Sequence, residues 1–140
     1  MTPEDFKKRT KEFALRGIRL AEALPKSSTG FVIARQLLRC ATSVGANYRS
    51  ACRARSRADF VAEMRIVEEE CDEAIYWMEL LVETELVEPK LLEPLMGEAE
   101  EILSLVVSSI KTARARGKSP IRNRQSPIGN KVAPGERVSG

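Results

Sequence analysis

The feature that most constrains the fold is a periodic row of apolar residues between positions 57 and 85. Its members recur at steps of three and four residues, a spacing that places them on one face of an α-helix. They are Phe60, Met64, Val67, Cys71, Ala74, Met78 and Leu81. A helix with one apolar face must bury that face against other elements, so this row predicts one helix of a packed helical domain.

Three further segments carry the same periodicity. We expect these helices at about 2–24, at about 30–54, and from a start between 89 and 94 to about 116. Thr2, Ser56 and either Ser28 or Thr29 stand where they can cap helix starts. Because short connections make successive helices antiparallel, we predict an all-α fold, an antiparallel up-down-up-down four-helix bundle over residues 1–116.

Charge is distributed unevenly along the 140 residues, whose net charge is +3. Residues 1–116 contain 18 Lys and Arg against 19 Asp and Glu, and residues 117–140 contain five against one. The second segment lacks periodicity and is rich in Gly, Pro, Ser and Arg, so we expect a disordered basic tail at 117–140. No apolar run is long enough for a membrane span or a signal peptide, and a cytoplasmic location is expected.

The absence of histidine removes the commonest general base and the usual Ser-His and Cys-His nucleophile pairs. We therefore expect no enzymatic activity, no catalytic residue and no cofactor. The acidic run at 68–73 is reminiscent of di-iron bundles, but these pair Glu with a Glu-x-x-His motif, so no metal site is expected. Cys40, Cys52 and Cys71 occupy apolar helical positions and are predicted to be buried free thiols.

Four arginines share one face of the helix predicted at 30–54, and two more extend the charge into the following turn. The six candidate nucleic-acid-binding residues are Arg35, Arg39, Arg49, Arg53, Arg55 and Arg57. Three interpretations stay open: a solvated face, a contact with the acidic helix of a neighbouring subunit, or phosphate binding through the planar guanidinium groups.

Two other groups of residues invite a structural interpretation. Gly45 in a helix interior costs about 1 kcal/mol against Ala, which favours a close helix crossing, with Asn47 bonding across it, over a reactive site at Ser43. Ile75, Tyr76 and Trp77 leave little polar circumference on their helix, and they predict an oligomer interface. Base stacking by Tyr76 and Trp77 is the alternative, less favoured because no arginine is close in sequence.

Several of these segments together resemble the four-helix-bundle family of the 23S rRNA intervening-sequence proteins, and are similar to accessory proteins of diversity-generating retroelements. The matching residues are GFVIARQLLR at 30–39, TSVGAN at 42–47, Ser56 with Asp59-Phe60, and Tyr76-Trp77. The resemblance implies a homo-oligomeric bundle, typically a homopentamer, without known catalytic activity. For the retroelement branch it also implies binding of nucleic acid and a reverse transcriptase.

The sequence departs from the family pattern directly after the TSVGAN run. Where the family has an apolar residue, a small residue and Glu, this chain has Tyr48-Arg49-Ser50. Our hypothesis is a non-enzymatic homo-oligomeric accessory protein that binds RNA or DNA through the arginine face. The alternative is a protein-interaction scaffold whose charged faces serve self-assembly.

Overall fold

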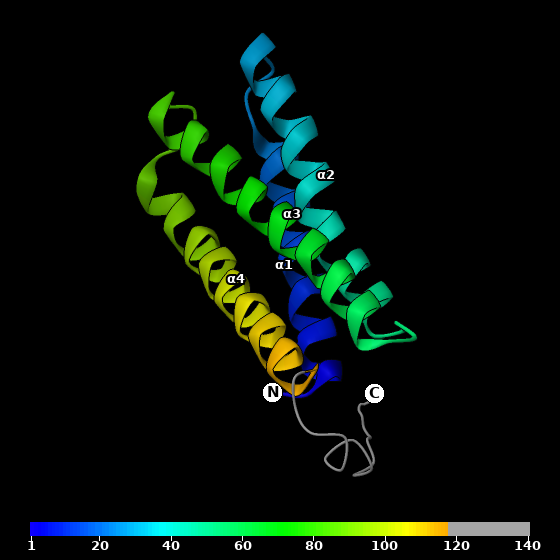
Figure 1. Cartoon of the computed structure of the whole chain (residues 1–140). Helices are drawn as coiled ribbons and strands as arrows, with labels where there is room; N and C mark the ends of the chain where they lie inside the picture. Colours follow the sequence, from blue (N-terminus) through cyan, green and yellow to red (C-terminus); the bar gives the residue numbers. More distant parts are fainter. Residues whose placement is uncertain (118–140) are drawn as a thin grey trace.

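The computed structural model describes residues 1–117, which form four α-helices (Figure 1). They are α1 (Pro3–Ala23), α2 (Ser28–Ala51), α3 (Arg57–Glu83) and α4 (Pro89–Gly117). The helices alternate in direction and are joined by short connections, which confirms the predicted antiparallel four-helix bundle. Gly117 ends α4, and the rest of the predicted basic tail lies outside the described residues.

Side-chain oxygens cap three of the helix starts. Thr2 forms a reciprocal capping box with Asp5 at the start of α1, and Ser56 accepts a hydrogen bond from the Asp59 amide at the start of α3. For α2 the predicted cap was wrong by one or two positions. Ser27 is the cap, and its hydroxyl oxygen accepts a hydrogen bond from the Gly30 amide.

The C-terminal ends of the helices differ from the predictions by one to three residues. The end of α3 is followed by Glu85 in the left-handed region, at φ 61°. The Leu86 amide donates to the Leu81 carbonyl and the Glu85 amide to the Val82 carbonyl, both at 3.0 Å, which is the paired hydrogen bonding of a Schellman motif. The position after the cap is usually glycine, so this helix end carries local backbone strain.

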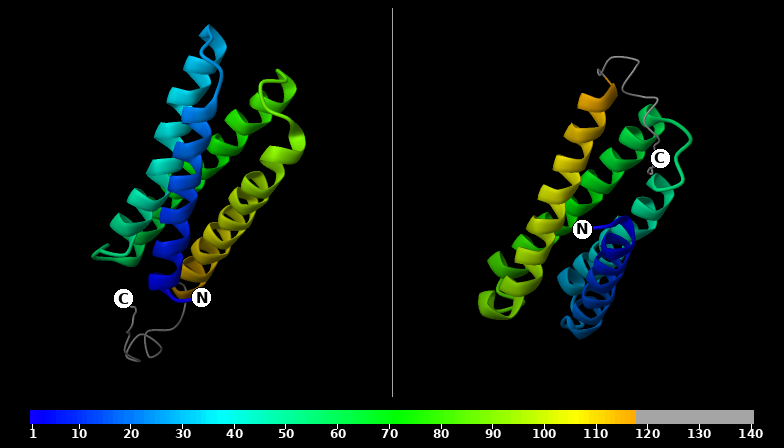
Figure 2. Two further views of the ribbon diagram at one scale, coloured as in Figure 1. Left: turned by 180° about the vertical axis from the view of Figure 1, so that it is seen from behind. Right: turned by 90° about the horizontal axis from the view of Figure 1, so that it is seen from below.

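The core is formed by the apolar faces of all four helices. Residues from each helix are almost completely inaccessible, among them Phe13, Leu37, Met64, Met78 and Ile102. The helices pair mainly as α1 with α2, α2 with α3, and α3 with α4. In Figures 1 and 2, the start of α1 and the end of α4 approach each other, and the two helices diverge toward the opposite end of the bundle.

Small residues allow α1 and α2 to pack closely. A Cβ added to Gly17 would lie 2.6 Å from the Ala41 Cβ, and one added to Gly45 would lie 3.2 Å from the Thr10 Oγ1. The predicted close crossing at Gly45 is therefore confirmed. The prediction for Asn47 was wrong, because its side-chain amide donates to the Ser43 carbonyl of the same helix at 2.9 Å.

Within residues 1–117, none of the four helices contains a stretch long and apolar enough to cross a membrane.

Candidate nucleic-acid interface

The six candidate arginines fall into two groups along the bundle. Arg35 and Arg39 lie in the first half of α2, whereas Arg49 lies in its last turn and Arg53, Arg55 and Arg57 follow in the connection and the first residue of α3. At 1.5 Å per residue, the 14 residues from Arg35 to Arg49 correspond to about 21 Å along the helix axis. All six side chains are exposed, but they do not form one compact patch.

Arg39 is bound to acidic residues of its own chain. Its Nη1 donates to Glu70 at 3.0 Å, and its Nη2 forms an ion pair with Glu73. Glu73 also accepts a hydrogen bond from the Trp77 Nε1 at 3.2 Å. Arg39 therefore binds the acidic helix of its own subunit, α3, so this contact does not require a neighbouring subunit. Its ion pairs connect α2 to α3, so its guanidinium is not free to bind phosphate.

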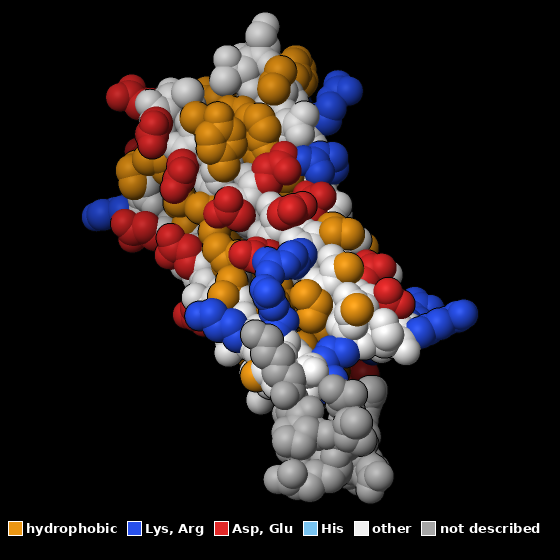
Figure 3. All heavy atoms as spheres, in the orientation of Figure 1, with side chains coloured by type: hydrophobic (Ala, Val, Ile, Leu, Met, Phe, Trp, Pro, Cys, Tyr) orange, Lys and Arg blue, Asp and Glu red, His pale blue; other side chains and the backbone are white. Residues whose placement is uncertain are grey.

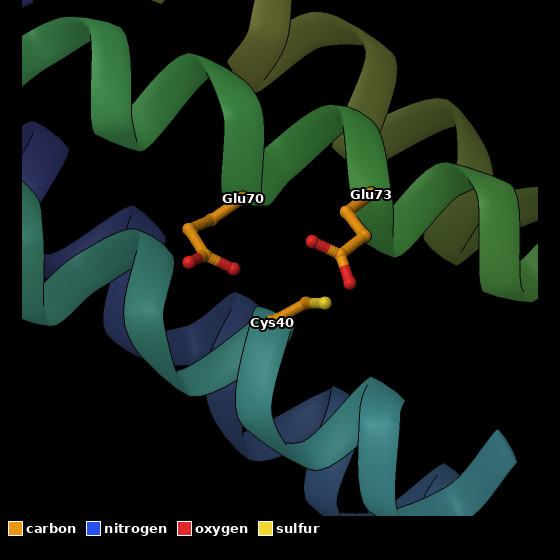
Figure 4. A group of neighbouring side chains, drawn as sticks. All are labelled: Cys40, Glu70 and Glu73. Carbon is orange, nitrogen blue, oxygen red and sulfur yellow. The ribbon is translucent and has the colours of Figure 1, made fainter. Parts of the chain in front are cut away.

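A cluster of three metal-ligating side chains lies beside Arg39. Cys40 projects from α2, and the carboxylates of Glu70 and Glu73 project toward it from α3 (Figure 4). Burial, reinforced by Glu73, raises the pKa of the Cys40 thiol to about 12, so without a metal ion this thiol is protonated near neutral pH. The Arg39 guanidinium already supplies the positive charge between the two carboxylates, so the donors do not fit a metal ion.

The other five arginines have a different environment. Within residues 1–117, Arg35, Arg49, Arg53, Arg55 and Arg57 form no ion pair with a carboxylate. An open hollow of about 510 Å³ separates the end of α2 from the start of α3, and its lining combines two of these arginines with acids and small residues. The lining residues are Ala46, Ser50, Arg53, Ala54, Arg55, Asp59, Ala62 and Glu63. The five exposed guanidinium groups, rather than the hollow itself, are accessible to anions that approach from solvent.

The predicted oligomer interface is only partly at the surface. Ile75 is 8% exposed and belongs to the core of its own bundle, whereas Tyr76 is 51% exposed. Trp77 is half-buried and makes an edge-to-face contact with Tyr76, the ring centroids being 5.1 Å apart. Figure 3 shows hydrophobic side chains gathered on this face with acidic side chains around them. Tyr76 is thus the residue of the three that a partner could reach.

Sequence reasoning missed two features of this region. Arg39 and Trp77 share the Glu73 carboxylate, although 38 positions separate them in the chain, so an arginine does lie near the aromatic pair. Cys52 was predicted to be buried, but α2 ends at Ala51, and Cys52 is an exposed thiol at the end of the bundle. The observed end of α2 explains this error, because the prediction extended the helix to residue 54.

The fold and site define a class of protein: a small antiparallel helical bundle with charged outer faces and a strongly basic region where α2 passes into α3. The model of the 23S rRNA-intervening sequence protein family matches residues 4–108, and the chain belongs to this family. No match was found among curated proteins.

A similar solved structure comes from Bacteroides thetaiotaomicron VPI-5482 and is described as a protein of unknown function from the S23 ribosomal protein family. It is 39% identical, has a TM-score of 0.74, and covers 79% of this chain and 99% of its own.

Proposed function

We propose that the protein is a non-enzymatic, homo-oligomeric accessory factor that binds RNA or DNA through arginines around the end of α2. The observation that carries the proposal is the contrast between Arg39, which two carboxylates neutralise, and the five candidate arginines without such partners in the described chain. Guanidinium groups that are exposed and unpaired can bind phosphate without first breaking an ion pair. The family's description as 23S rRNA-intervening sequence proteins agrees with an RNA-related role.

The test is binding of a fluorescent RNA or DNA measured by anisotropy over a series of salt concentrations. Replacing Arg49 and Arg53 by Glu should weaken binding at least tenfold at 100 mM salt. The slope of log K against log salt, which is negative, should become shallower by about 2, because each lost phosphate contact removes about 0.7–0.9 from its magnitude. Arg39→Gln is a control at an ion-paired arginine of the same helix. It should reduce the stability of the bundle more than it changes the salt slope.

A second candidate function is a scaffold that uses its surfaces for self-assembly, and the exposed Tyr76 favours it. Wild-type protein that shows no salt-dependent binding at low ionic strength would leave the scaffold as the better account. A reverse transcriptase partner, implied by the similarity to retroelement accessory proteins, is tested by whether the gene lies beside one and by co-purification of the two proteins.

A further inference from the structure

The topology brings four chain segments to one end of the bundle. The start of α1, the end of α2, the start of α3 and the end of α4 all lie there (Figure 1). Phe6 of α1 contacts Tyr48 of α2, with ring centroids 4.7 Å apart. Gly117 of α4 lies against the first residue of α3, since a Cβ there would be 3.3 Å from the Arg57 Cδ.

These segments concentrate positive charge that the linear sequence disperses. Residues 1–8, 49–59 and 108–117, which we name the basic end, contain nine Lys and Arg against three Asp and Glu, a net of +6. The remainder of residues 1–117 contains nine against sixteen, a net of −7. In Figure 3, acidic side chains gather over α3 and α4 away from this end. The described part of the chain is therefore polarised along its length.

Most of the charge at the basic end is available to a ligand. Its exposed arginines form no ion pair within the described residues. They are Arg49, Arg53, Arg55, Arg57, Arg114 and Arg116. By contrast, Lys7 at the same end is paired with Glu4 at 3.1 Å. The chain continues from Gly117 with a further five Lys and Arg against one Glu at 118–140, which raises the positive charge connected to this end.

The basic end has no exposed aromatic side chain on which a base could stack. Phe6 and Tyr48 are buried there and Phe60 is half-buried, whereas the exposed aromatic residues of the described chain, Phe31 and Tyr76, lie elsewhere. Proteins that bind single strands combine positive charge with such stacking surfaces. Positive charge alone favours the nucleic acid with the higher density of phosphates, which is a duplex with one charge per about 1.7 Å of its axis.

We infer that the basic end binds the phosphate backbone of a nucleic-acid duplex without reading its sequence. The inference rests on the proposed function, and it assigns nucleic-acid binding to a different set of arginines. Arg114 and Arg116 of α4 join Arg49, Arg53, Arg55 and Arg57, whereas Arg35 and Arg39 do not take part. Duplex RNA and duplex DNA share the chemistry that this surface recognises.

The experiment compares two double variants of the full chain that change the net charge equally. Arg114→Glu with Arg116→Glu alters the basic end, and Lys26→Glu with Lys90→Glu alters exposed residues at the other end. Binding to a duplex RNA, a duplex DNA and an unstructured single strand of equal length is measured by anisotropy from 50 to 200 mM salt. Circular dichroism melting checks that both variants fold.

The basic-end variant should lose at least tenfold in duplex affinity at 100 mM salt, with a salt slope smaller by about 2. The control should stay within about threefold, because its charges lie more than one Debye length, about 10 Å at this salt concentration, from the basic end. Wild-type protein should bind both duplexes more tightly than the single strand.

Three results would overturn the inference: equal losses in the two variants, no loss in the basic-end variant, or tighter binding of the single strand. If Arg49→Glu with Arg53→Glu still weakens binding in any of these cases, the proposed function stands, whereas the inferred duplex surface with its α4 arginines fails. If wild-type protein binds none of the three nucleic acids, the proposed function itself fails.

Discussion

Glu85 occupies a position at the end of α3 where the left-handed backbone conformation usually selects glycine. It takes the left-handed conformation at φ 61° that the Schellman motif requires, and a side chain in this region costs about 1–2 kcal/mol relative to the right-handed one. The cost is tolerated because Leu86, the next residue, packs against the core and the two hydrogen bonds of the motif are formed. Strain here belongs to the α3–α4 connection, distant from the basic end.

Replacing Glu85 by Gly should therefore raise the free energy of unfolding by about 0.5–1 kcal/mol, part of the gain being offset by the greater freedom of glycine in the unfolded chain. Urea denaturation followed by circular dichroism measures the difference. Glu83→Gly is the control, since position 83 is still helical and exposed, and that variant should lose up to about 1 kcal/mol. A loss of stability in Glu85→Gly would contradict this account.

Two glycines inside helices should respond in opposite ways to the same change. Gly97→Ala should stabilise the protein by about 0.5–1 kcal/mol, because a Cβ there has no neighbour within 4 Å and alanine favours the helix. Gly17→Ala should destabilise it by about 1–3 kcal/mol, because its Cβ would approach the Ala41 Cβ to 2.6 Å and force α1 from α2. Denaturation midpoints that shift equally for both variants would exclude a packing role for Gly17.

Between elements, α1 and α4 are connected by a charged cluster that compensates for their limited contact. Arg9 donates to both oxygens of Glu98, at 2.6 and 2.8 Å, and also binds Glu101. Its side chain and that of Glu98 are less than one quarter exposed. The hydrogen bonds from Arg9 hold the pKa of Glu98 below its ordinary value, despite the opposing effect of burial.

This cluster predicts a pH-dependent contribution to stability. A carboxyl whose pKa is lowered on folding stabilises the folded state above its unfolded pKa of about 4.3, and this contribution disappears as the pH falls through the folded value. Arg9→Gln should thus cost about 1 kcal/mol near pH 7 and progressively less below pH 4. Arg19→Gln is the control, because its contact with Glu12 is 3.8 Å long and exposed. A cost that is independent of pH would contradict the assignment.

The elements were predictable because each helix needs only local information: apolar residues at three- and four-residue steps, with Thr2, Ser56 and the prolines near the boundaries. The α2 end was misplaced because Cys52 continues the apolar spacing although the helix has already stopped. The partners of Arg39 lie 31 and 34 positions away, and local spacing carries no signal for such contacts. Likewise, Arg114 and Arg116 join the α2 arginines only through the bundle topology.

At the scale of the whole molecule, the proposed self-assembly can be tested through Tyr76. Tyr76→Glu should lower the molar mass measured by light scattering at micromolar concentration, because it puts a charge into the proposed apolar interface while leaving the core untouched. Leu91→Glu is the control, since Leu91 is 74% exposed at the start of α4. A monomeric wild-type protein, or equal masses for wild type and both variants, would rule out this interface.

The basic end has a net charge of +6 and the rest of residues 1–117 a net charge of −7. This separation of charge affects the rate of association with a polyanion and does not depend on any single contact. Such a molecule carries a large dipole moment along the helix axes, and the field of a polyanion turns it before the two surfaces touch. The protein would then arrive with its basic end foremost in most encounters. Its association rate would exceed that of an evenly charged bundle with the same net charge, and the advantage would vanish as added salt shortens the range of the field.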